Sequence, residues 1–96
     1  MSEAKYQRHL KAVLENTFPD CVVLKNDPEH FQGLPDLLIL FYDKWAALEV
    51  KVSRDAHRQP NQQYYIDMFD QMSFAAFIYP ENEEEIINEL REAFRN

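Results

Sequence analysis

The chain has 96 residues, 46% hydrophobic and 28% charged, with a formal net charge of −7 at pH 7. This length and composition predict one folded domain over residues 1–96 with a single core, and they exclude a disordered chain. The excess of Asp and Glu over Lys and Arg disfavours a polyanionic partner unless the basic residues gather on one face. Two short basic clusters, near the start and after residue 50, keep such a face open.

Neither a membrane span nor a zinc site is apparent. The first twenty residues carry charges throughout and lack the apolar block of a signal peptide. The longest unbroken apolar run, residues 37–42, is too short to cross a bilayer. We therefore expect a cytoplasmic protein without membrane contact. The single cysteine, Cys21, is expected to be a small buried hydrophobe, and no Cys/His pattern indicates zinc.

In the first half of the chain, apolar residues at helical spacing predict a helix over residues 3–17. A short β-branched run predicts a strand at 21–25, and the polar stretch 26–33, which holds the only glycine, predicts a loop. Residues 37–42 and 45–52 then predict two strands so close together that they must form a hairpin.

In the second half, Pro60 suits the first turn of a helix of roughly three turns. Residues 74–79 predict a fourth strand. Asn82, with Glu85 three residues later, resembles a capping box that opens a final helix. The order α-β-β-β-α-β-α predicts an α/β fold with a mixed sheet flanked by helices.

Two carboxylates and an ammonium, those of Asp36, Glu49 and Lys51, lie in or beside the apolar strands of the predicted hairpin. If Asp43-Lys44 forms the turn, all three side chains project from one face of the sheet, because side chains alternate along a strand and cross-strand partners share a face. The predicted cross-strand partners are Tyr42 with Trp45, Leu38 with Glu49, and Asp36 with Lys51.

The predicted register makes Asp36 and Glu49 diagonal neighbours, roughly 7 Å apart at Cβ, so both carboxylates can reach one ion. They raise each other's pKa unless a cation lies between them. Hard oxygen ligands without sulfur or imidazole favour Mg²⁺ or Mn²⁺. Lys51 beside such an ion can orient attacking hydroxide and neutralise charge that develops on a phosphate.

Each of these residues also has a purely structural interpretation. Asp36 and Lys51 could form a cross-strand ion pair with Glu49 at a solvated edge, which is the commoner meaning of so short a pattern. In this interpretation Gln62, on the inner face at the start of the second helix, has the sole role of a hydrogen-bonding residue at the helix end. Likewise Glu3, on the inner face of the first helix, has the sole role of a solvated acid that complements the helix dipole. The one-faced hairpin and its apolar flanks favour a metal site.

Together these residues resemble the PD-(D/E)XK nuclease superfamily, and within it the VRR-NUC branch in the short single-domain form found in phages and related to Holliday-junction resolvases. The resemblance spans nearly the whole chain. The matching segments are Glu3 with Gln7, Gly33-Leu34-Pro35-Asp36, Glu49-Val50-Lys51 and Asn61-Gln62.

The resemblance implies a restriction-endonuclease-like core and a role for each site residue. Asp36, Glu49 and the backbone carbonyl of Val50 would bind Mg²⁺ or Mn²⁺, and Lys51 would serve the nucleophilic water. Glu3 and Gln62 would support the metal or the substrate.

We therefore expect a metal-dependent endonuclease acting on DNA. Because so small a domain has little surface for reading sequence, selectivity for branched or structured DNA is expected. Cutting two strands needs two active sites, so a homodimer is expected. Two alternatives remain: a non-catalytic module that binds nucleic acid or protein, and an acidic DNA mimic that inhibits another nuclease. A larger protein partner that supplies a basic surface also remains open.

Overall fold

The structure, a computed structural model, describes residues 1–27, 29 and 31–95. The elements in chain order are α1 (Glu3–Thr17), β1 (Val22–Lys25), β2 (Leu37–Phe41), β3 (Lys44–Val50), α2 (Pro60–Met72), β4 (Phe74–Ile78), a 3-10 turn (Pro80–Asn82) and α3 (Glu83–Ala93). This order confirms the predicted α-β-β-β-α-β-α arrangement. The predicted loop 26–33 includes positions 28 and 30, which lie outside the described residues.

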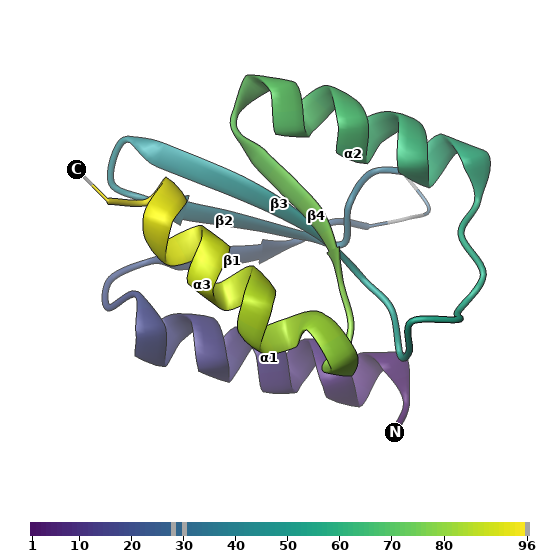
Figure 1. The fold of residues 1–96 in the computed structure, drawn as a ribbon, viewed down its shortest axis with the longest axis horizontal. Coiled ribbons are helices and arrows are strands. Elements are labelled where there is room, and N and C mark those ends of the chain that lie inside the picture. Colours follow the sequence, from purple (N-terminus) through teal and green to yellow (C-terminus); the bar gives the residue numbers. More distant parts are fainter. Residues whose placement is uncertain (28, 30, 96) are drawn as a thin grey trace.

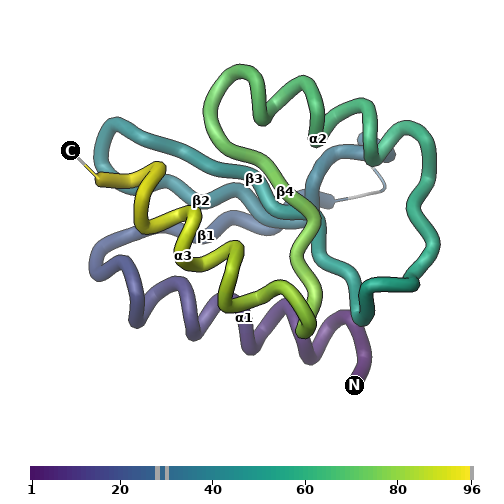
Figure 2. Tube along the Cα trace, viewed as in Figure 1, coloured from purple at the N-terminus to yellow at the C-terminus, as the bar shows by residue number. Residues whose placement is uncertain are grey.

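The strands form one mixed sheet in the order β1-β2-β3-β4 (Figure 1). β1 pairs antiparallel with β2, and β2 with β3, whereas β3 and β4 pair parallel. A parallel pair needs a crossover connection, and α2 provides it. α2 lies on one side of the sheet, while α1 and α3 lie on the other (Figure 2).

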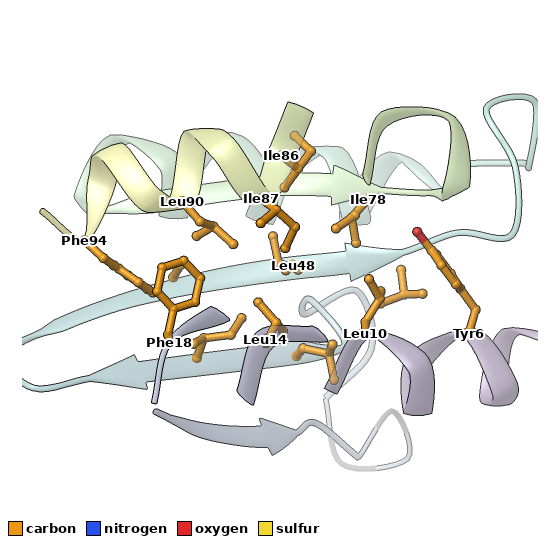
Figure 3. Packing of buried hydrophobic residues seen from close by; sticks show 14 residues of the cluster. Tyr6, Leu10, Leu14, Phe18, Leu48, Ile78, Ile86, Ile87, Leu90 and Phe94 are labelled. Atoms are coloured by element: carbon orange, nitrogen blue, oxygen red, sulfur yellow. The ribbon is translucent and has the colours of Figure 1, made fainter. Parts of the chain in front are cut away.

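The main core lies between the sheet and the α1/α3 pair (Figure 3). Leu10 and Leu14 of α1 and Leu90 of α3 meet Leu48 and Ile78 of the sheet, and all five side chains are fully buried. A smaller cluster under α2 contains Ala47, Ile66, Ala75 and Phe77. Within the described residues, no helix is both long and apolar enough to cross a membrane.

α1 begins where its sequence predicts. The Ser2 hydroxyl accepts a hydrogen bond from the Lys5 backbone N–H at 3.1 Å, which satisfies one of the free donors of the first turn. Tyr6 and Gln7, together with Leu10 and Leu14, form the buried stripe of the helix.

The predicted hairpin register is wrong by two residues. The turn is Tyr42-Asp43 rather than Asp43-Lys44, so Phe41 pairs with Lys44 and Leu40 with Trp45. A two-residue hairpin loop calls for a positive φ that matches the strand twist, and Tyr42 adopts φ 57°. A shift of two preserves which side chains share a face, because side chains alternate with a period of two.

The shift nevertheless changes the partners of the charged residues. Leu37 pairs with Leu48, and extending the register by one residue places Asp36 opposite Glu49. The two carboxylates are therefore direct cross-strand neighbours rather than diagonal ones, and the predicted pairing of Asp36 with Lys51 is wrong. Direct opposition strengthens the repulsion between them.

The predicted capping box before the last helix is also wrong. Asn82 makes no side-chain cap to α3. Its Oδ1 instead accepts from the Tyr79 N–H at 2.8 Å, and its Nδ2 donates to the Phe77 carbonyl at 3.0 Å. The intervening 3-10 turn redirects this side chain toward β4, so Asn82 fixes the exit of the strand.

Candidate active site

The predicted site residues lie at the end of the hairpin where β2 begins and β3 ends. Asp36 directly precedes β2, Glu49 and Val50 are the last residues of β3, and Lys51 follows them. Gln62 lies in the first turn of α2, which packs on β3 and β4. Three chain segments therefore converge beside the carboxyl end of a parallel strand pair, where α/β sheets place ligand sites.

Asp36 is held by the backbone of β3. The Val50 N–H donates to Asp36 Oδ2 at 2.9 Å, just beyond the last regular β2–β3 pair. On the other side, the Asn26 N–H donates to the Asp36 carbonyl oxygen at 2.8 Å. Both bonds fix the Asp36 side chain at the mouth of the hairpin.

Gln62 links Glu49 to Lys51. Its Nε2 donates to Glu49 Oε2 at 2.9 Å, while its Oε1 accepts from Lys51 Nζ at 2.9 Å. The same oxygen accepts from the Gln59 N–H at 2.9 Å, which ties the amide to the start of α2. Lys51 Nζ also donates to the His57 carbonyl at 2.9 Å and lies 3.8 Å from Glu49 Oε2.

The carboxyls lie where negative charge is unfavourable. Glu49 is only 3% exposed, and burial, followed by the negative charge of Asp36, raises its pKa to about 8. Burial is also the main cause that raises the pKa of Asp36. Lys51 lowers both pKa values without cancelling these effects. A bound cation would stabilise the ionised pair.

The oxygen donors fit a hard divalent ion. Glu49 Oε1 is buried and has no hydrogen-bond partner among the described residues, so an acceptor is free beside Asp36. The Val50 N–H points toward Asp36. Because the N–H and C=O groups of one strand residue point to the same neighbouring strand, the Val50 carbonyl is directed to the Asp36 side as well. Residues 1–27, 29 and 31–95 contain no group of three or more His, Cys, Asp or Glu placed to hold a metal, so this carbonyl and water would complete the ligand set.

Glu3 lies at the rim. Its Oε1 accepts from Gln7 Nε2 at 3.3 Å, and Glu3, Gln7 and Asp36 line a common cavity of about 270 Å³. Its charge adds to the raised pKa of both site carboxyls. The structure thus places Glu3 beside the site, but within the described residues no hydrogen bond joins it to the Glu49–Gln62–Lys51 network.

Two neighbouring features were not predicted as site components. Gln7 is 8% exposed, and its Oε1 is buried with no hydrogen-bond partner in the described part of the chain. Its place among Leu10 and Leu14 on the buried stripe of the first helix was the available signal. Gln59 bonds the Gln62 amide through its backbone, which leaves no mark in the sequence.

A polar groove of about 510 Å³ opens beside the network. Its lining residues are Gln32, Gly33, Gln59, Asn61 and Gln62. Gly33 has φ +90°, and a Cβ there would lie 2.6 Å from Asn61 Nδ2, so only glycine lets the loop approach α2 this closely. The Gly33 and Asn61-Gln62 segments of the sequence pattern are therefore in contact.

Two solved structures are similar to the fold of this chain. No protein-family model matches the sequence, and no curated protein matches it significantly. A solved structure described as a VRR_NUC domain is 22% identical with a TM-score of 0.69, and the match covers 97% of each chain. The Holliday junction resolvase Hjc of the archaeal hyperthermophile Archaeoglobus fulgidus is 14% identical with a TM-score of 0.57, over 79% of this chain and 67% of Hjc. The chain therefore shares its fold with a VRR_NUC domain and with Hjc, which is the fold that the sequence resemblance implied.

Proposed function

We propose that the chain is an Mg²⁺- or Mn²⁺-dependent endonuclease that hydrolyses phosphodiester bonds in DNA. The observation that carries the proposal is the Glu49–Gln62–Lys51 network beside Asp36, at the end of a hairpin in this fold. A structural module alone has no use for a buried Glu49 carboxyl whose pKa burial and the neighbouring Asp36 charge both raise. The similarity to a Holliday junction resolvase supports branched DNA as the substrate class.

Asp36, Glu49 and the Val50 carbonyl are the groups that would hold the metal. When bound, such an ion polarises a phosphate oxygen and lowers the pKa of a coordinated water. The protein's contribution is to hold the two carboxylates in place: the Val50 N–H fixes Asp36, and Gln62 fixes Glu49 Oε2. Glu49 Oε1, which has no hydrogen-bond partner in the described part of the chain, would be the oxygen that faces the ion.

Lys51 is the proposed partner of the reacting groups. An ammonium has three donors, and Gln62 Oε1 and the His57 carbonyl accept two of them. The third donor is available to a phosphate oxygen or to the attacking water, where the positive charge neutralises the charge of the transition state. Gln62 is a positioning residue, and Glu3 with Gln7 would support substrate or water at the rim.

The first experiment offers labelled four-way junction, flap, single-stranded and duplex DNA to the purified protein. Reactions contain Mg²⁺, Mn²⁺ or chelator, with Glu49→Ala as the inactive variant and Glu89→Ala, a surface acid of α3, as the matched control. We expect cutting only with metal, strongest on branched DNA, lost in Glu49→Ala and retained in Glu89→Ala. Mn²⁺ binding followed by electron paramagnetic resonance should be lost in the same variant.

Two results would contradict the proposal. A folded protein that cuts none of these substrates under any metal condition would favour the binding module or the DNA mimic. Cutting that persists in Glu49→Ala would place the chemistry elsewhere or in a contaminant.

A further inference from the structure

Three aromatic side chains gather at the N-terminal half of α2. The Tyr65 ring contacts Phe31 with ring centroids 5.8 Å apart and Tyr64 with centroids 5.2 Å apart, both edge-on. Tyr65 also packs on Phe69 of the same helix, which anchors it to the smaller core cluster. Phe31 and Tyr64 remain 50% and 59% exposed. We call Phe31, Tyr64 and Tyr65 the aromatic rim; packing explains Tyr65 but leaves two rings facing solvent.

The aromatic rim borders the polar groove beside the candidate active site. The segment between β1 and β2 passes close to the start of α2 (Figure 1), so Gln32, next to Phe31, lines the groove together with Gln62. Tyr64 lies two residues beyond Gln62, or about 3 Å along the helix axis. Successive phosphates of one DNA strand are separated by a similar roughly 3.4 Å. The exposed rings therefore lie within roughly one or two nucleotides of a phosphate bound at the site.

The two segments beside the groove carry no charge. Residues 31–35 (FQGLP) and 59–66 (QPNQQYYI) supply amide, aromatic and apolar side chains without an acid or a base. In a chain of net charge −7, these segments neither repel DNA nor attract its phosphates. Aromatic rings stack on bases, and side-chain amides bond base edges. The groove and the aromatic rim therefore fit an uncharged nucleobase better than the phosphate backbone.

A nucleobase reaches a side-chain ring only when it is unpaired and unstacked, because neighbouring bases cover both of its faces in a duplex. We propose that Phe31 and Tyr64, supported by Tyr65, form a stacking site for an unpaired nucleobase of the DNA substrate, next to the phosphate that is cut. The proposal deepens the proposed function, on which it rests for the position of that phosphate. It narrows the substrate class to DNA with an unpaired nucleotide at the cleavage site, as in a flap, a single-stranded arm or an open junction centre.

Binding to flap DNA in chelator, where the strand stays intact, tests the stacking site. An abasic residue replaces each of the first three unpaired nucleotides in turn, and fluorescence anisotropy gives the dissociation constant. At the position that stacks, the abasic residue should weaken wild-type binding roughly 10-fold, the size expected for one stacked base. The double variant Phe31→Leu/Tyr64→Leu should bind the intact flap with the same loss and should not respond to the abasic residue, because rings and base act as one pair.

Two control variants separate stacking from other effects. Tyr42→Asn removes a ring that is 78% exposed at the tip of the hairpin, away from the groove, and Asn tolerates the φ of 57° at this position. Tyr64→Phe keeps the ring of the aromatic rim and removes only its hydroxyl. Both variants should bind the intact and the abasic flap as the wild type does.

Three results would overturn the stacking site. The first is a wild-type affinity that no abasic position changes, the second is a double variant that keeps the wild-type response, and the third is a wild type that binds no flap DNA. If circular dichroism shows the double variant unfolded, Tyr64→Leu, a single change at an exposed position, decides in its place.

Because this test needs no cleavage, it separates the stacking site from the nuclease proposal. A protein that binds the unpaired base through the aromatic rim but cuts no DNA with metal supports the stacking site and contradicts the nuclease. Cutting that depends on Glu49 but keeps wild-type affinity and rate in the double variant contradicts the stacking site and leaves the nuclease standing.

Discussion

Gln62 contacts both charged partners of the candidate site through one amide group. The Nε2 donor faces Glu49 and the Oε1 acceptor faces Lys51, so the amide cannot rotate without placing like groups together. The bond from the Gln59 N–H fixes the same orientation. Position and orientation of the two charges therefore depend on an uncharged side chain.

We predict that Gln62→Leu lowers the single-turnover cleavage rate by roughly 100-fold, because Lys51 loses an acceptor and Glu49 loses a donor. The effect should appear in kcat rather than KM, since Gln62 positions groups for the transition state. Gln63→Leu, which removes only an exposed bond to Asp67, is the matched control and should keep the wild-type rate. Equal losses in both variants would show that α2, not the amide, is being perturbed.

Protonation of Glu49 makes the free energy of unfolding depend on pH. Its pKa rises from 4.5 in the unfolded chain to about 8 in the folded protein, so between these values the folded state holds a proton that the unfolded state has lost. The contribution of Glu49 to the free energy of unfolding is therefore highest below about pH 4.5, and it falls as the pH rises toward 8.

Glu49→Gln mimics the protonated form and should remove this pH dependence. In chelator, we expect the variant to be more stable than the wild type at pH 8, by on the order of 2–4 kcal/mol, and nearly equal to it at pH 5. Urea denaturation at the two pH values measures the difference. Glu89→Gln, an exposed acid, should change stability little at either pH; a Glu49→Gln variant less stable at pH 8 would contradict the assigned direction.

At the scale of elements, two connections carry polar contacts between distant backbone and side-chain groups: the link from β4 to α3 and the link from β3 to α2. The link between β4 and α3 is a 3-10 turn whose last residue, Asn82, bonds backward to Tyr79 and Phe77. The link between β3 and α2 supplies the His57 carbonyl to Lys51. In both connections a polar side chain binds backbone groups and so helps to fix the path of the chain between strand and helix.

We predict that Asn82→Ala destabilises the protein by about 1–2 kcal/mol, because it leaves a part-buried N–H and a carbonyl without their partner. Glu85→Gln should change stability by less than about 0.5 kcal/mol, because Glu85 is exposed and Asn82 does not cap α3. Urea midpoints of both variants test this. A large cost for Glu85→Gln would restore the capping box as the feature that opens α3.

At the scale of the whole molecule, the acidic surface of α3 is separate from the candidate active site. α3, with Glu83, Glu84 and Glu85 in its first turn, lies on the face opposite α2. The candidate site lies beside the N-terminal end of α2. The acidic surface therefore weakens the approach of DNA at long range without contacting the reacting groups.

Replacing Glu84, Glu85 and Glu89 with Lys changes the net charge from −7 to −1, since each replacement adds two charges. We expect tighter DNA binding at low salt, measured by fluorescence anisotropy, with an unchanged single-turnover rate at saturating DNA. The gain should disappear as salt screens the field. A gain that persists at high salt would mean that α3 contacts the DNA directly.

The sequence by itself determined the element order and the set of charged residues. Apolar periodicity placed every helix and strand to within about two residues, and alternation put Asp36, Glu49 and Lys51 on one face whether or not the register was right. These properties are local: they depend on spacing along one strand or helix.

Tertiary structure alone decided which of these groups touch. The choice of Tyr42 over Lys44 as a turn residue set Asp36 against Glu49, and the crossover of α2 brought Gln62 between Glu49 and Lys51. Contacts between distant segments depend on register and packing, which spacing along the chain does not encode.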